Sequence, residues 1–148
     1  MSIDANKALV RRWFAELDRG NIAAVEEFIA GDYHDHNPAI PDLPPGRDGV
    51  TQANLLLYAA FTDVTHEIKD QIAEGDKVMT RLVVRGKFTG EFLGFPPTGQ
   101  VVAIEGAAVH RLADGKLVEH WAHVDMADFM RQIGAITLPP APPTAQRD

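Results

Sequence analysis

The spacing of apolar residues changes abruptly after Phe61, and this change limits the possible folds more than any other feature of the sequence. Before it, apolar residues follow the i, i+3, i+4, i+7 spacing of one helix face, at Val10, Trp13, Phe14 and Leu17. After it, apolar and polar residues alternate, which predicts a half-buried strand over 64–72. A helical first part followed by strands predicts an α+β fold.

The order of the predicted elements indicates how the sheet is built. A second helix carries Ile22 to Ile29 after an Asn21 cap and ends at Gly31, and a third runs from about Asp48 to Phe61. Further strands are predicted at 77–90, 101–112 and 117–124, and a last helix at 126–133. Because turns join consecutive strands, we expect one curved antiparallel sheet with the N-terminal helices packed on its concave face. A pocket for a small ligand would lie between these layers.

Length and composition restrict the class of protein. The 148 residues predict a single domain over 1–136 and a Pro-rich C-terminal tail over 137–148. The net charge of −7 argues against a nucleic-acid partner, and the absence of cysteine excludes disulfides and Cys-type zinc sites. No stretch is apolar enough to be a signal peptide or to span a membrane, so we expect a cytoplasmic protein without membrane contact.

Several motifs together resemble one family. They are "VRRWF", "GDYHDHNP", "GEFLGFPPTGQ", "HRLADGKLVEHWAHVD" and "RQIG", and they extend over nearly the whole chain up to Gly134. They are similar to motifs of the SnoaL-like polyketide cyclases, also called ester cyclases, in the nuclear-transport-factor-2-like superfamily. The resemblance implies a cone-shaped α+β barrel, so the curved sheet is expected to form a cone-like half-barrel. It also implies ring closure by intramolecular aldol condensation without metal or cofactor.

The resemblance also implies where the family's polar groups would stand. Family members use an aspartate on the last strand, with a histidine and a glutamine on the preceding strand that help to hold the enolate. Those positions fall on Ala122, Ala108 and Gly106 in this sequence. The groups that carry the family's aldol chemistry are therefore absent from these positions.

Strand alternation identifies other candidates on the same face. If Gly106, Ala108 and Ala122 face the pocket, His110 and His120 do so as well, whereas Trp121 points outward. This facing requires a three-residue "ADG" turn with Gly115 as the bulge residue. His120 is the best candidate for acid/base catalysis, and the equally weighted alternative is a core histidine satisfied by a hydrogen bond.

The segment "YHDHNP" (33–38) supplies a second set of candidates, in the loop expected after the second helix. We predict that His36 and Asn37, but not His34, line the pocket, with His120 across from them. His36 would be catalytic and Asn37 an oxyanion donor. The alternative is a polar turn in which Asp35 binds nearby backbone amides. The other residues expected to line the pocket are Trp13, Phe14, Tyr58 and His110.

Two functional hypotheses remain open at this stage. The first is a SnoaL-like cyclase-type enzyme that performs cofactor-independent acid/base chemistry on a small apolar carbonyl or polyketide-like compound. The second is a non-catalytic protein that binds a small apolar molecule, or another isomerase or hydrolase of the superfamily. The histidine spacings are too weak to predict a metal site. We expect a homodimer through the convex face, which would carry Val101, Ala103, Val109 and Trp121.

Overall fold

The computed structural model describes residues 1–140 and 143, and these residues form four helices and five strands. In chain order the elements are α1 (Ile3–Asp18), α2 (Ala24–Phe28), β1 (Ile29–Asp35), α3 (Gly46–Ala60), β2 (Phe61–Glu74), β3 (Lys77–Phe88), β4 (Val101–Ala113), β5 (Lys116–Val124) and α4 (Met126–Gln132). Most of the predicted Pro-rich tail, residues 141–142 and 144–148, lies outside the described residues.

The five strands form one curved sheet in the order β1-β5-β4-β3-β2. The predicted α+β fold with a curved sheet is therefore confirmed, and the four predicted strands pair in antiparallel fashion. The sheet as a whole is mixed, because β1 runs parallel to β5. The sequence pattern predicts a helix at the start of this segment and a loop for the rest. That prediction is wrong, because β1 covers the edge of β5 and satisfies backbone groups that would otherwise be exposed.

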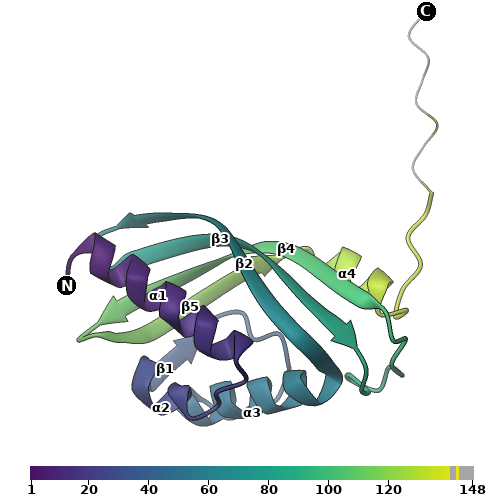
Figure 1. Cartoon of the computed structure of the whole chain (residues 1–148), viewed down its shortest axis with the longest axis horizontal. Helices are drawn as coiled ribbons and strands as arrows, with labels where there is room; N and C mark the ends of the chain where they lie inside the picture. Colours follow the sequence, from purple (N-terminus) through teal and green to yellow (C-terminus); the bar gives the residue numbers. More distant parts are fainter. Residues whose placement is uncertain (141–142, 144–148) are drawn as a thin grey trace, which may run out of the picture.

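The helices of the first part lie together against one side of the sheet (Figure 1). Helix α1 crosses β2 and β3, whereas α3 contacts β1 and β2. Helix α1 begins at an N-cap, Ser2, whose hydroxyl accepts a hydrogen bond from the amide of Ala5 at 3.1 Å. Asp125 caps α4 in the same way, accepting from the amide of Asp128 at 3.0 Å, as its position before the last helix predicted.

Two apolar clusters fill the space between the layers. The first joins α1 and α2 to the inner faces of β3, β4 and β5, and its large members include Trp13, Phe14, Phe28 and Leu117. The second is an aromatic cluster under α4, containing Phe61, Phe88, Phe92 and Phe129. Ring centroids in the second cluster lie between 5.2 and 6.2 Å apart, within the range of favourable aromatic contacts.

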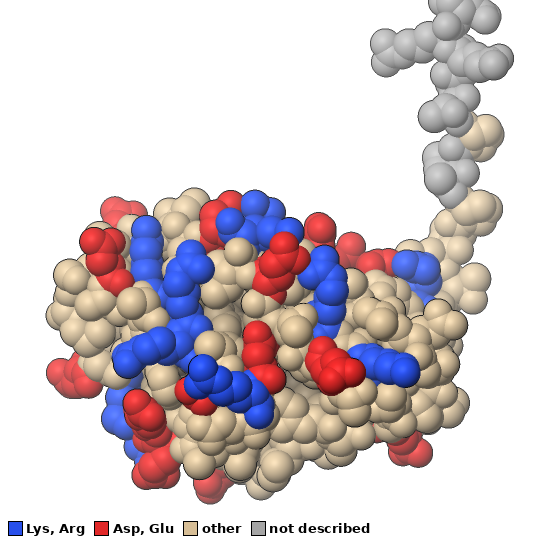
Figure 2. All heavy atoms as spheres, in the orientation of Figure 1, with Lys and Arg blue, Asp and Glu red and all other residues tan. Residues whose placement is uncertain are grey.

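Charged side chains of both signs alternate on the face shown in Figure 2. Ion pairs join charged side chains of neighbouring strands, such as Arg81 with Asp70 at 2.8 Å and Arg85 with Glu67 at 2.6 Å. No helix among residues 1–140 and 143 combines the length and the apolar character needed to cross a membrane.

Candidate functional site

The register of β4 and β5 places the two predicted histidines together on the inner face of the sheet. His110 lies opposite His120, and Ala108 lies opposite Ala122. The same face continues on β3, where Val78 pairs with His110. Val78 is fully buried under the helices. The predicted facing of His120 is therefore correct.

The turn that produces this facing is not the predicted one. Ala113 pairs with Lys116 across a two-residue turn, in which Asp114 and Gly115 both have positive φ, at 50° and 73°. The register then slips by one residue, so that Val118 has no partner on β4. This bulge restores the parity that a two-residue turn alone would break.

His120 forms a pair with Asp35, which comes from the neighbouring strand β1. The two residues are register partners, and Nδ1 of His120 lies 3.2 Å from Oδ1 of Asp35. The carboxylate also accepts a hydrogen bond from the amide of Asn37 at 2.9 Å. Burial acts to raise the pKa of Asp35, but the hydrogen bond and charge of His120, together with the Asn37 amide, outweigh it and leave the pKa lowered. Asp35 is therefore an ionised partner that orients the His120 ring.

His110 completes a group of three polar side chains across β4, β5 and β1. Its ring stacks on that of His120, with centroids 4.8 Å apart and 28° between the planes, and meets the edge of Phe14 at 5.8 Å. His110 is 2% exposed, and its Nδ1 atom has no hydrogen-bond partner among the described residues. Burial, and to a smaller extent the charge of His120, hold the pKa of His110 well below its usual value, so its ring is neutral.

The prediction that His36 lines the pocket is wrong. His34 and His36 are two residues apart in an extended segment, so they share a face, and their ring centroids lie 4.2 Å apart. That face is the outer one: His36 stacks on Trp121 at 4.4 Å with only 4° between the planes. Its Nε2 atom lies 3.9 Å from a carboxylate oxygen of Glu119. Asp35, between the two histidines, is the residue that points inward.

The remaining predicted residues have clear positions. Asn37 accepts a hydrogen bond from the amide of Ala122 at 3.2 Å, which continues the β1–β5 contact. Trp13 and Phe14 are buried in the first apolar cluster, and the hydroxyl of Tyr58 donates to the carbonyl of Leu17 at 2.9 Å. No group of three or more His, Asp or Glu side chains among residues 1–140 and 143 is arranged to hold a metal ion.

Comparison with known proteins identifies the family. The family model described as SnoaL-like polyketide cyclase matches residues 8–133. The chain belongs to the SnoaL-like polyketide cyclase family. It is 30% identical over 132 residues to the aklanonic acid methyl ester cyclase DnrD of Streptomyces peucetius, covering 85% of this chain and 88% of the relative. It is 30% identical over 121 residues to the nogalonic acid methyl ester cyclase of Streptomyces nogalater, covering 80% and 89%.

Solved structures confirm the family fold. TsrD from Streptomyces laurentii superposes with a TM-score of 0.83 at 23% identity, covering 92% of this chain and 99% of the other. IdmH from Streptomyces antibioticus, described as a putative polyketide cyclase, gives a TM-score of 0.73 at 29% identity, covering 87% and 98%. The α+β architecture is thus shared along nearly the whole of each protein.

Within this SnoaL-like chain the polar groups occupy a different row of the sheet. Ala108 and Ala122, which align with the histidine and aspartate of the family resemblance, are cross-strand partners. The next inward-facing pair is His110 and His120, two residues along each strand, or about 7 Å away. Asp35 extends this second row onto β1, and it was not among the candidate site residues predicted from the sequence. The two-residue strand period in "YHDHNP" is the signal that points to it.

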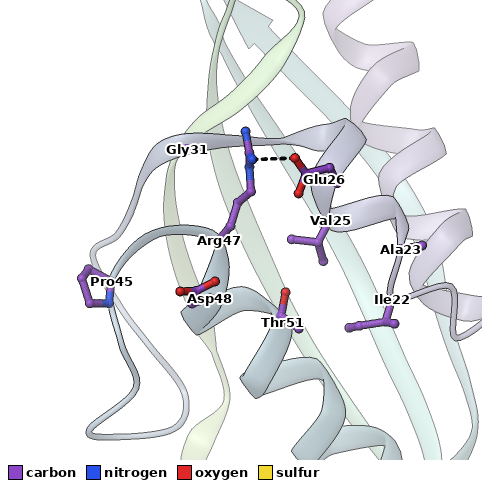
Figure 3. Close-up of a pocket in the computed structure, with 9 residues that line it drawn as sticks. All are labelled: Ile22, Ala23, Val25, Glu26, Gly31, Pro45, Arg47, Asp48 and Thr51. Carbon is purple, nitrogen blue, oxygen red and sulfur yellow. Dashed lines mark hydrogen bonds and ion pairs between the residues drawn. The ribbon is translucent and has the colours of Figure 1, made fainter.

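Two cavities of this SnoaL-like chain lie outside that row. One, of about 410 Å³, opens between α2, β1 and the start of α3 (Figure 3). Arg47 spans it, donating to the carbonyl of Ile29 at 2.7 Å and to Glu26 at 2.9 Å. The other, of about 640 Å³, lies between the N-terminus of α1 and the two hairpin turns. Neither cavity is lined by His110, His120 or Asp35.

Proposed function

We propose that this SnoaL-like protein catalyses ring closure of a polyketide-like carbonyl compound, with His120 as the acid/base group and Asp35 as its orienting partner. The observation that carries the proposal is the Nδ1–Oδ1 contact of 3.2 Å between them. A carboxylate can only accept, so this contact keeps the proton on Nδ1 and leaves Nε2 of a neutral ring as the basic atom. The neutral His110 stacked on His120 adds no competing charge.

The proposed reaction is an intramolecular aldol step. Nε2 of His120 takes the proton from the carbon next to a carbonyl group, and the resulting enolate carbon attacks a second carbonyl of the same molecule. One carbon–carbon bond forms, and the attacked oxygen becomes an alkoxide. His120 then returns the proton to that oxygen, so the product is an isomer of the substrate and the reaction consumes no cofactor.

The names of the relatives suggest the substrates with which to begin. Both are described as cyclases of methyl esters, one of aklanonic acid and one of nogalonic acid. We propose that this chain acts on a related polyketide ester. The purified protein should therefore be incubated with each of these two esters, and the cyclised product should be followed by liquid chromatography and mass spectrometry.

Substitutions then test which histidine acts. His120→Gln and Asp35→Asn should each lower kcat/KM by about 10²-fold or more, because they remove the base or its orientation. His36→Gln is the matched control, since this ring stacks on Trp121 on the outer face, and it should leave kcat/KM within about twofold. A His120→Gln variant with wild-type turnover would contradict the proposal.

A second candidate function is binding without turnover. It is favoured by Gly106, Ala108 and Ala122, which offer no polar groups where the family resemblance places three. Native mass spectrometry of the protein with either ester detects the complex, and liquid chromatography of the released ligand, which separates the cyclised isomer from the ester, distinguishes the two functions. A stable complex from which only the unchanged ester is recovered would favour binding.

We further propose that two copies associate through the convex face of the sheet. His36, stacked on Trp121, forms a flat aromatic surface there, and Lys77 lies over the Trp121 ring at 5.5 Å. At one end of the same face the apolar side chain of Val101 is 67% exposed.

A further inference from the structure

The larger of the two cavities, of about 640 Å³, lies at the end of the molecule where α1 begins and two antiparallel hairpins turn. In Figure 1 the N-terminus stands beside the tips of the β2–β3 and β4–β5 hairpins. The volume is within the range of cavities that bind small molecules. His110, His120 and Asp35 do not line this cavity, so it is separate from the site of the proposed reaction.

Asn6 is the buried polar side chain of this cavity. It belongs to the first turns of α1, lines the cavity and is only 4% exposed. Its side-chain oxygen, Oδ1, has no hydrogen-bond partner among the described residues. A buried amide oxygen without a partner lowers stability, because folding has removed its hydrogen bonds to water. Asn6 therefore offers an unused acceptor, which a donor group of a ligand in the cavity can satisfy.

The two hairpin turns each contribute one carboxylate to the wall of the cavity, Asp76 before β3 and Asp114 before β5. Asp114 is exposed, and it forms no ion pair with any residue that the structure describes. Asp76 lies 3.8 Å from Nη1 of Arg111, too far for a hydrogen bond, and that guanidinium group contacts Glu119 more closely, at 3.2 Å. Both carboxylates can therefore accept hydrogen bonds from a ligand.

Turn geometry explains only part of this arrangement. Aspartate is common in tight turns, partly because it tolerates a positive φ, which is 50° at Asp114. That preference accounts for a carboxylate in a turn but not for Asn6, because asparagine is a poor helix former and is seldom buried. An apolar side chain would fill the same helical position without an unpaired oxygen. The amide of Asn6 is therefore the observation that points to a ligand.

We propose that this cavity binds a small organic cation through a primary ammonium group. Such a group has three N–H donors and no acceptor, and the cavity supplies one acceptor from each of three elements, at Asn6, Asp76 and Asp114. Hydrogen bonds between an ammonium group and a carboxylate are stronger than those between neutral groups. The apolar side chains that line the cavity, Met1 and Leu112, would contact the hydrocarbon part of the ligand.

Three small compounds separate charge from hydrogen bonding. The n-butylammonium ion carries a charge and N–H donors, tetramethylammonium carries the charge alone, and 1-butanol has the same carbon chain without charge. In proton–nitrogen correlation spectra of the full-length protein, n-butylammonium should shift the amides of Gly75 and Gly115 saturably, with a Kd on the order of 1 mM. The other two compounds should bind about tenfold more weakly or less.

Substitutions at the three acceptors test the site itself. Asp76→Asn and Asp114→Asn preserve the turns, because asparagine suits the same backbone, and each should weaken n-butylammonium binding about fivefold. Asn6→Leu removes the third acceptor without opening a hole and should weaken binding about tenfold. Asp42→Asn is the matched control, since it changes another exposed aspartate with positive φ, 61°, that does not line the cavity. It should leave the Kd within about twofold of wild type.

Two results would overturn the inference. Equal affinities for n-butylammonium and tetramethylammonium, or equal losses in Asp42→Asn and Asp114→Asn, would mean that the net charge of −7 attracts cations without a specific site. The absence of saturable shifts at Gly75 and Gly115 would show that the cavity holds no ammonium group. If Asn6→Leu does not fold, the two aspartate variants still decide the question. The ester assays test the cyclisation proposal separately, because these variants leave His120 and Asp35 unchanged.

Discussion

His110 shows how a single buried residue can lower the stability of the fold. It is buried beside Phe14 and His120, and its Nδ1 atom has no partner among the described residues. A buried polar atom left unpaired costs about 1–3 kcal/mol, so this side chain is not retained for stability. We therefore propose that it belongs to the candidate site, where it stacks on one side of the His120 ring.

The titration of His110 gives a prediction at the same scale. Its pKa in the folded protein lies well below the usual 6.5, so below pH 6.5 the unfolded chain binds a proton that the folded chain excludes. The free energy of unfolding therefore falls as the pH drops below 6.5, by about 1.4 kcal/mol per pH unit. Urea unfolding at pH 7 and pH 5 should show that His110→Phe loses about 2 kcal/mol less than wild type over this interval.

The control for this measurement is His123→Phe, at an exposed position on β5, which should lose as much stability as wild type. Equal losses in wild type and His110→Phe would mean that His110 takes up a proton in the folded state.

At the scale of elements, β4 and β5 approach each other closely at Gly106. A Cβ atom built on this glycine would lie 2.6 Å from both the carbonyl oxygen of His123 and a methyl carbon of Val124. The two strands are therefore too close together at Gly106 to accommodate a side chain there. The glutamine that the family resemblance places at this position could not be accommodated without separating the two strands.

We accordingly expect Gly106→Ala to lower the free energy of unfolding by about 2 kcal/mol, the usual cost of inserting an atom into a tightly packed region. Chemical denaturation provides the measurement. Ala107→Val, at the next position of β4 and on the other face, should change the stability by less than about 0.5 kcal/mol. If Gly106→Ala is as stable as wild type, β5 must be able to move away from β4.

Helix α4 is joined to the sheet by one side-chain amide. Gln132 accepts a hydrogen bond from the amide of Ala103 at 2.9 Å and donates to its carbonyl at 2.8 Å. The pairing of β5 with β4 ends before it reaches Ala103. The glutamine therefore makes the two backbone hydrogen bonds that a longer β5 would have made with Ala103. This contact places Phe129 and Ile133 over the aromatic cluster.

Removal of that amide should loosen α4. We expect Gln132→Ala to lower the free energy of unfolding by about 1–3 kcal/mol, since two partly buried hydrogen bonds are lost. Hydrogen–deuterium exchange should show faster exchange of the Ala103 amide. The exposed Gln100→Ala is the control, and unchanged protection of Ala103 in Gln132→Ala would contradict the account.

At the scale of the whole molecule, the proposed dimer interface on the convex face of the sheet can be tested by introducing one negative charge. A glutamate at Trp121 would place a carboxylate beside Glu119 and remove the ring on which His36 stacks. Light scattering at micromolar concentration should give the mass of two chains for wild type and of one chain for Trp121→Glu. Leu55→Glu, at an exposed apolar position on α3, should leave the mass unchanged. A wild-type protein with the mass of one chain would contradict the proposed dimer.

Local periodicity was sufficient to predict most elements of this chain. The change of spacing after Phe61 predicted the helices and the antiparallel strands, because each pattern of burial depends on residues close together in sequence. Asp125 was recognised as a cap for the same reason, since the cap and the amide it binds are three residues apart. Motif resemblance supplied the family, and with it the expectation of a cone-shaped barrel.

The tertiary structure decided the features that depend on distant partners. Ile29–Asp35 forms a strand because the edge of β5, about 90 residues further along the chain, is available to pair with it. The pairing of His120 with Asp35, and of His66 with Asp18, likewise brings together strands and helices that are remote in sequence. Such contacts depend on sheet order and register, which local patterns do not encode. The sequence thus determined which faces are apolar, and the packing of the sheet determined which polar groups meet between them.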